Sequence, residues 1–182
     1  MAQSNTRERD RAVRTLTIDP RIRRIGFASF DAALLEDWGV RNIRSQTPAV
    51  RVRRLLIPSL IRMLDRFEPA VLLIPDVRPG AVRRSQHVRE TIEAVVREAL
   101  RRGIVVHSIT DAQVKKAFQR PNGRGPNKQK INHLLVEWFP ELQALLPEAR
   151  RLWESERYFT PLFDAIARYC AWQGVPEIGD SR

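Results

Sequence analysis

The strongest constraint on the fold is a short apolar run at residues 70–74, Ala-Val-Leu-Leu-Ile, which lies between Pro69 and Pro75. An uninterrupted apolar run bounded by turn signals is typical of a strand buried on both faces. Such strands occur in sheets that helices cover on both sides. We therefore expect an α/β protein in which residues 70–74 form a central strand. Residues 104–109 are predicted to form the next buried strand.

The rest of the chain shows the periodicities of short strands and amphipathic helices. Residues 13–18, 26–30 and 38–43 are candidate strands with turn-length connections, which predicts an antiparallel meander. Apolar residues then recur at helical spacing over residues 48–67, where Pro58 should kink or delay the helix. Further helices are predicted at residues 85–102, ended by Gly103, and at residues 111–118, 128–138 and 161–172.

This order of elements predicts the fold class and the domain organisation. Three short strands followed by alternating helices and strands predict a mixed five-stranded sheet, flanked by helices. Its first strand should be antiparallel to its early neighbours and parallel to the later ones. The 182 residues, 43% of them hydrophobic, suffice for one core. We assign residues 13–175 to a single domain, residues 1–12 to a flexible charged arm and residues 176–182 to a tail.

The charge balance indicates a polyanionic partner. Lys and Arg outnumber Asp and Glu by 32 to 21, which gives a formal net charge of +11. Most of the basic residues are arginine, whose planar guanidinium matches the geometry of phosphate. Neutralising nucleic-acid phosphates releases condensed counterions, so a chain of this charge is expected to bind nucleic acid. The alternative is a solvated basic surface, although the basic residues cluster around turns and helix starts.

Composition also excludes several classes of protein. No apolar stretch is long enough to span a membrane, and the charged N-terminal segment is not followed by an apolar targeting segment. We therefore expect a cytoplasmic protein without a membrane partner. The single cysteine excludes an internal disulfide, and with only three histidines the chain has no Cys/His cluster for structural zinc. Cys170 lies in an apolar helical run and is expected to be buried.

Three aspartates are candidates for a metal-dependent active site. Asp19 and Asp76 each follow a predicted strand, so they should emerge together at one edge of the sheet if those strands are neighbours. Asp164 lies in an otherwise apolar segment near the start of the final helix, where an acid needs a partner. Three oxygen donors suit Mg²⁺ or Mn²⁺, which activate water for phosphodiester hydrolysis. The three residues are therefore predicted to form a nuclease site.

Each aspartate also has a purely structural interpretation. Asp19 precedes a proline and can start a turn, and Asp76 can end a strand. Asp164 can stabilise the N-terminus of the final helix through the helix dipole. The combination of all three with the basic charge balance favours a site over these separate roles.

Five sequence elements, in order, resemble those of RuvC-type Holliday-junction resolvases over residues 15–173. The similar elements are residues 17–20 with Gly26, the break at residues 67–69, residues 113–115, Lys128 with His133, and the closing motif at residues 163–167. The resemblance implies a ribonuclease-H-like fold and a homodimeric endonuclease that depends on Mg²⁺ or Mn²⁺. It implies that the substrate is branched DNA such as Holliday junctions, in DNA recombination and repair.

The resemblance also assigns roles to further residues. Lys115 and Lys128 are similar to the two lysines near the family's active site. The family's second acid falls on Pro75, with Asp76 one residue later, so Asp76 reaches a shared metal only if the strand has ended or bulged. The family's fourth acid falls on Pro161. The resemblance offers Glu156 as its replacement, since residues 153–156 resemble a Ser-Glu-Asp motif of uncharacterised bacterial RuvC-like proteins.

Two basic segments are predicted to bind nucleic acid. Residues 115–130 carry no acid, and Gly123 and Gly125 would let the backbone approach a phosphate closely. A solvated helix face is the alternative for the second segment, at residues 78–89. The predicted phosphate contacts are Arg120, Arg124 and Lys130 in the first segment, beside Lys115 and Lys128, and Arg78, Arg83, Arg84 and Arg89 in the second.

Three functions are compatible with these features. The leading hypothesis is a divalent-metal-dependent, structure-selective DNA endonuclease. A ribonuclease-H-like nuclease that processes structured RNA fits the same carboxylates. The third is a catalytically inactive RuvC-like DNA-binding protein, which the prolines at positions 75 and 161 favour.

Overall fold

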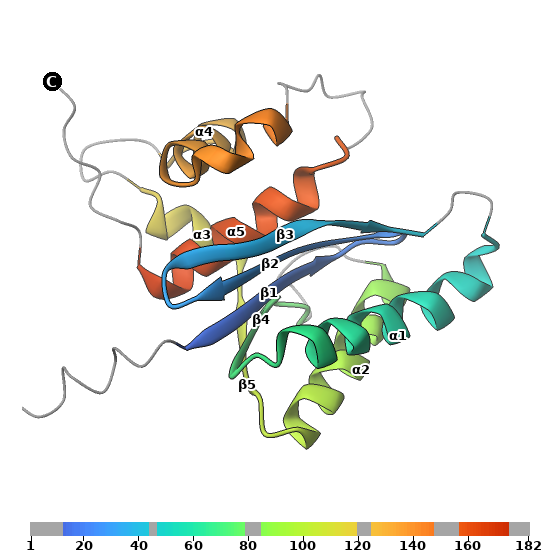
Figure 1. Ribbon diagram of the computed structural model, residues 1–182. Coiled ribbons are helices and arrows are strands. Elements are labelled where there is room, and N and C mark those ends of the chain that lie inside the picture. Colours follow the sequence, from blue (N-terminus) through green and yellow to red (C-terminus); the bar gives the residue numbers. More distant parts are fainter. Residues whose placement is uncertain (1–12, 44–46, 79–84, 120–124, 148–156, 175–182) are drawn as a thin grey trace, which may run out of the picture.

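A five-stranded mixed sheet with helices on both faces forms the centre of the protein (Figure 1). The computed structural model describes residues 13–43, 47–78, 85–119, 125–147 and 157–174. The strand order is β3-β2-β1-β4-β5, so β1 lies in the middle of the sheet. The predicted fold class, an α/β protein with a mixed five-stranded sheet, is confirmed.

The strands follow the predicted directions. β1 (Arg14–Pro20), β2 (Arg24–Asp31) and β3 (Leu34–Asn42) form an antiparallel meander. β4 (Val71–Pro75) is parallel to β1, and β5 (Val105–Ile109) is parallel to β4. β4 is buried along its whole length, as predicted. The prediction that residues 104–109 form a fully buried strand is wrong, because β5 lies at the edge of the sheet and Val105 is 52% exposed.

The helices form two layers (Figure 1). α1 (Ala49–Phe67) and α2 (Gln86–Arg101) cover one face of the sheet. The structure excludes one of the two predicted effects of Pro58, a delayed helix start, since α1 begins at Ala49 and continues through Pro58. A kink at Pro58 stays a prediction. Leu56 and Leu60 on either side are buried, and packing of this apolar face stabilises the helix despite the lost backbone hydrogen bond. The other face carries α3 (Asp111–Ala117), α4 (Lys128–Trp138), the 3-10 helix η1 (Pro140–Leu145) and α5 (Thr160–Gln173).

Successive side chains of each strand pack into opposite layers. In β4, Val71 and Leu73 belong to the core beneath α5, whereas Leu72 and Ile74 belong to the core beneath α1 and α2. This alternation follows from the two-residue repeat of a β-strand. The position of an acid along a strand therefore decides which layer its carboxylate faces.

α5 packs directly on the central strands. The Thr17 hydroxyl on β1 donates a hydrogen bond of 2.9 Å to the backbone oxygen of Ala165 on α5. The rings of Phe30 and Tyr169 stack with their centroids 3.5 Å apart. The first contact places the second turn of α5 over β1, and the second contact places a later turn over β2. No helix among the described residues is both long and apolar enough to cross a membrane.

Candidate nucleic-acid site around an aspartate pair

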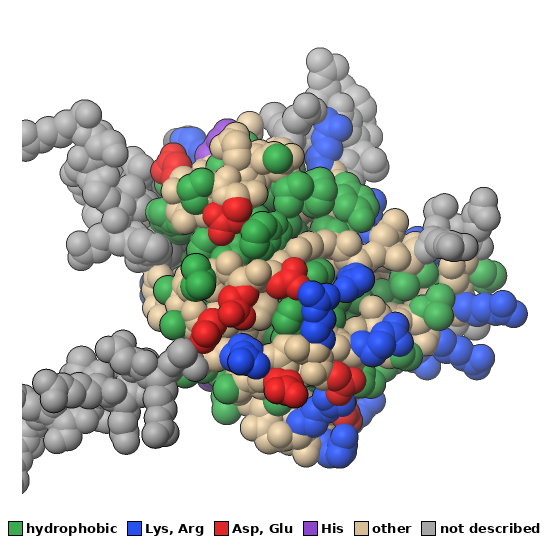
Figure 2. Space-filling view, in the orientation of Figure 1, with side chains coloured by type: hydrophobic (Ala, Val, Ile, Leu, Met, Phe, Trp, Pro, Cys, Tyr) green, Lys and Arg blue, Asp and Glu red, His purple; other side chains and the backbone are tan. Residues whose placement is uncertain are grey.

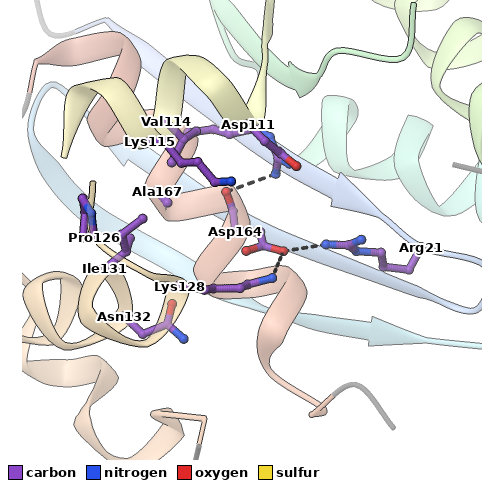
Figure 3. A pocket seen from close by; sticks show the side chains of 11 residues that line it. Arg21, Asp111, Val114, Lys115, Pro126, Lys128, Ile131, Asn132, Asp164 and Ala167 are labelled. Atoms are coloured by element: carbon purple, nitrogen blue, oxygen red, sulfur yellow. Dashed lines mark hydrogen bonds and ion pairs between the residues drawn. The ribbon is translucent and has the colours of Figure 1, made fainter. Parts of the chain in front are cut away.

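The end of β1 and the start of α5 bring two of the predicted acids together. Asp19 lies two residues after Thr17 on β1, so its side chain faces α5. The Arg21 guanidinium bridges the two acids, since its Nε lies 2.6 Å from Asp19 Oδ2 and its Nη2 lies 2.5 Å from Asp164 Oδ2. Figure 3 shows the ion pair between Arg21 and Asp164. A shared arginine thus joins Asp19 and Asp164, two of the three predicted acids.

A second arginine, Arg168, lies behind this pair. Asp19 is completely buried, and its Oδ1 accepts a hydrogen bond of 2.9 Å from Arg168 Nη1. Arg168 is one helical turn beyond Asp164 on α5 and is only 2% exposed. Its Nη1 also donates to the backbone oxygen of Asp164, and its Nη2 donates to Asp111 Oδ1 at 3.2 Å. Arg168 therefore joins β1, α3 and α5 through one guanidinium.

Sequence reasoning missed both arginines. Arg21 is separated from Asp19 by a single residue, and Arg168 is the only charged residue between Asp164 and the end of α5. Arg168 is a charged residue in an otherwise apolar helix, and the same kind of pattern indicated that Asp164 needs a partner. The pattern does not reveal, however, that Arg168 reaches across the layer to Asp19.

Arg21, Asp164 and Arg168 line a pocket between α3, α4 and α5, and two lysines form its outer side. Lys128 begins α4, and its Nζ lies 2.8 Å from Asp164 Oδ2. Asn127 fixes this helix start, because its side chain accepts a hydrogen bond from the backbone N–H of Lys130. Lys115 on α3 lines the same pocket (Figure 3). Both predicted active-site lysines therefore line the pocket that contains Asp164, and Lys128 contacts this acid directly. Lys130 is an exposed residue in the first turn of α4.

Asp76 faces the opposite helical layer, which corrects the predicted convergence of three aspartates. Asp76 continues the series of alternate residues, Leu72 and Ile74, that face α1 and α2. It lines a separate pocket together with residues of α2. Its carboxylate accepts hydrogen bonds from the Arg78 side chain, at 2.6 Å from Nη2, and these bonds lower the pKa of Asp76. The one-residue displacement from Pro75 thus reverses the face of the side chain. Among the alternate residues of β4 that face α5, Leu73 is followed by Pro75, which has no carboxylate.

The described residues do not fit the predicted three-carboxylate site for Mg²⁺ or Mn²⁺. Within the described ranges, no three His, Cys, Asp or Glu side chains are grouped closely enough to hold a metal ion. Asp19 and Asp164 supply carboxylates on one face, and Arg21, Arg168 and Lys128 already neutralise them.

The other predicted contacts are divided between the second pocket and segments outside the described residues. Arg78 and Arg89 line the pocket that contains Asp76. On the face drawn in Figure 2, basic side chains over α1 and α2 lie among acidic ones. The ion pairs of α1 include Arg66 with Asp37 and Asp65 with Arg102. The predicted roles of Arg83, Arg84, Arg120, Arg124 and Glu156 stay predictions, because these residues lie outside the described ranges.

No protein-family model and no curated protein matches the sequence, but solved structures share its fold. RuvC from T. thermophilus in complex with a Holliday junction substrate is 20% identical, with 87% of this chain and 91% of that chain covered and a TM-score of 0.60. A second Thermus thermophilus RuvC structure is 22% identical, with coverages of 87% and 92% and a TM-score of 0.59. The chain has the RuvC-type fold.

The yeast mitochondrial Holliday junction resolvase Ydc2 shares this fold more distantly. It is 14% identical, with 89% of this chain and 79% of that chain covered and a TM-score of 0.54. The predicted resemblance to the RuvC-type, ribonuclease-H-like fold is therefore confirmed at the level of structure. Within this RuvC-type fold, the aspartate pair lies where the central strand meets the last helix.

Proposed function

We propose that this protein recognises branched DNA, such as Holliday junctions, through the pocket between α3, α4 and α5. The observation that carries the proposal is the Asp19–Arg21–Asp164 bridge with Lys115 and Lys128 beside it, on a RuvC-type fold. One solved structure with this fold holds a Holliday junction substrate. The shared fold and the basic side of the pocket together favour a DNA backbone as the ligand.

The charge of the pocket supports phosphate as the group that is bound. Four cationic side chains, from Arg21, Lys115, Lys128 and Arg168, line it. They face three carboxylates, from Asp111, Asp164 and the buried Asp19. The cations thus outnumber the acids. The side chain of Lys128 is 53% exposed, so its ammonium group is accessible to a ligand. Contacts of this kind position a DNA backbone without reading its sequence.

A second candidate function is divalent-metal-dependent cleavage of the bound DNA. It is favoured by the meeting of Asp19 and Asp164, the two acids that resemble the first and last acids of the family. Among the described residues, however, no three carboxylates are grouped closely enough to hold a metal ion. Glu156 is the residue that the sequence resemblance offers as a further carboxylate.

Binding and cleavage assays on matched nucleic acids test both candidates. The substrates are a four-way DNA junction, a linear duplex of the same sequence and a structured RNA, each with EDTA, Mg²⁺ or Mn²⁺. Junction binding in EDTA supports the recognition proposal, and equal binding of the linear duplex contradicts it. Symmetric cuts that require a metal and disappear in Asp164→Asn support the nuclease. Preferential cleavage of the RNA would instead identify an RNA-processing enzyme.

We also propose that the protein acts as a homodimer. A four-way junction presents strands in symmetric pairs, and a two-fold dimer would present one pocket to each strand of a pair. Light scattering on the protein alone and on its junction complex measures the subunit number. A single subunit in both samples would contradict this part of the proposal.

A further inference from the structure

We propose that Arg168 is a built-in cation that takes the place of a divalent metal ion at Asp19, so that the pocket binds Mg²⁺ or Mn²⁺ only weakly while Arg168 stays in place. The inference concerns ion binding by the pocket and does not depend on which nucleic acid the protein recognises. It follows from the contacts of Asp19, the burial of Arg168 and the charge around both.

Both oxygens of the Asp19 carboxylate are already engaged by guanidinium groups. Oδ1 lies 2.9 Å from Arg168 Nη1, and Oδ2 lies 2.6 Å from Arg21 Nε. A metal ion would have to replace at least one of these contacts to coordinate Asp19. Arg21 has 27% of its side chain exposed and can move into solvent. Arg168 has only 3% of its side chain exposed and is enclosed by the core.

Arg168 is held in place by groups other than Asp19. Its Nη1 donates to the backbone oxygen of Asp164 at 3.1 Å, and its Nη2 donates to Asp111 Oδ1 at 3.2 Å. The residues before and after it on α5, Ala167 and Tyr169, are buried in the core. The guanidinium therefore cannot leave Asp19 by a simple side-chain rotation into water.

The fixed positive charge also opposes a second cation. A divalent ion bound between Asp19 and Asp164 would lie close to Arg168, Arg21 and Lys128, which all contact this carboxylate pair. Like charges inside a partly buried site repel each other strongly, since little water screens them. A phosphate group would instead be attracted by the same cations. The donor set thus favours an anion over Mg²⁺ or Mn²⁺.

Replacement of Arg168 distinguishes this role from that of an ordinary structural ion pair. Arg168→Met removes the charge and retains an apolar side chain that fills the core, while Arg168→Lys retains the charge. The full-length proteins are titrated with Mn²⁺, with free Mn²⁺ measured by electron paramagnetic resonance and melting temperatures measured in parallel. Arg102→Met is the control, because Arg102 pairs with Glu98 and Asp65 in the opposite helical layer.

We expect Arg168→Met to bind Mn²⁺ at least about tenfold more tightly than the wild type. Mn²⁺ should also raise the melting temperature of this variant more than that of the wild type, because an ion that binds only the folded state stabilises that state. Arg168→Lys and Arg102→Met should match the wild type. A folded Arg168→Met protein with unchanged Mn²⁺ affinity would overturn the proposal.

The wild-type titration decides the question if Arg168→Met does not fold. Weak Mn²⁺ binding that Asp164→Asn does not change supports the proposal. Micromolar binding that is lost in Asp164→Asn overturns it, because the pocket would then hold a metal ion with Arg168 in place. Junction binding is measured separately in EDTA, so a failure of the DNA proposal remains distinguishable from a failure of this one.

Discussion

Gly26 on β2 lies directly against the backbone of Pro161 on α5. A Cβ atom at position 26 would come within 2.1 Å of the Pro161 carbonyl carbon, far inside any normal contact. Gly26 is also the antiparallel partner of Asp19 in the sheet register. The absent side chain therefore lets the first turn of α5 approach the strand end, and this approach carries Asp164 to Asp19.

Gly26→Ala is expected to destabilise the fold. The added methyl group meets backbone atoms that cannot turn away, so we expect a loss of about 1–3 kcal/mol or more in the free energy of unfolding. Denaturant unfolding measures this loss. Gly39→Ala is the matched control, since its Cβ would meet only the Phe27 ring, at 3.3 Å. Equal losses in the two variants would show that the close approach of α5 does not constrain position 26.

Asp19 and Asp164 should differ in their contributions to stability. Asp19→Ala leaves the buried Arg168 with only Asp111, whose side chain is 54% exposed, as a counter-ion, and this is expected to cost about 3–5 kcal/mol. Asp164→Ala removes one ion pair from Arg21, which keeps its contact with Asp19, and one from Lys128. Both cations are partly exposed, so about 0–1 kcal/mol is expected. Guanidinium unfolding of the two variants gives both values. The account of the buried pair is contradicted if Asp164→Ala is the more damaging change.

Lys128→Ala should weaken DNA binding equally for all sequences. Lys128 is half-exposed and is expected to contact phosphate, so its loss should reduce the slope of log affinity against log salt by about one. Fluorescence anisotropy over a range of salt concentrations measures the slope. Arg101→Ala is the control, because Arg101 lies on α2 and pairs with Glu98. An unchanged slope in Lys128→Ala would place the DNA elsewhere.

Cys170 is expected to be unreactive in the native protein. Burial raises the pKa of its thiol from an ordinary value of 9.0 to about 12, so the nucleophilic thiolate is scarce at neutral pH. Because the folded-state pKa is the higher one, the associated stability is complete below pH 9.0 and falls as the pH rises towards 12. Thiol titration with and without denaturant measures the accessibility. Rapid native labelling would contradict the burial of this residue.

The sequence predicts the sheet and the aspartate pair because each depends on local patterns. Strand periodicities and connection lengths indicate the meander and the parallel strands. Asp19 and Asp164 stand out as acids at a strand end and in an apolar helix. Their meeting then follows from the position of β1 in the centre of the sheet.

Other features depend on tertiary structure that no local pattern contains. The face of Asp76 depends on the residue at which β4 ends, since a shift of one residue exchanges the two layers. The exposure of β5 depends on its place at the sheet edge, whereas its composition resembles that of a buried strand. The contacts of Arg168 join three elements that are distant in the sequence.

The central claim, that the pocket beside Asp19 and Asp164 recognises branched DNA, is tested most directly by one affinity ratio. The ratio compares a four-way junction with a linear duplex of the same sequence, in EDTA at fixed salt. It is measured for the wild type and for the Lys115→Ala, Lys128→Ala double variant. We predict that the wild type prefers the junction by at least about tenfold, and that the double variant loses most of this preference. Equal wild-type affinities for the two DNAs would contradict the claim.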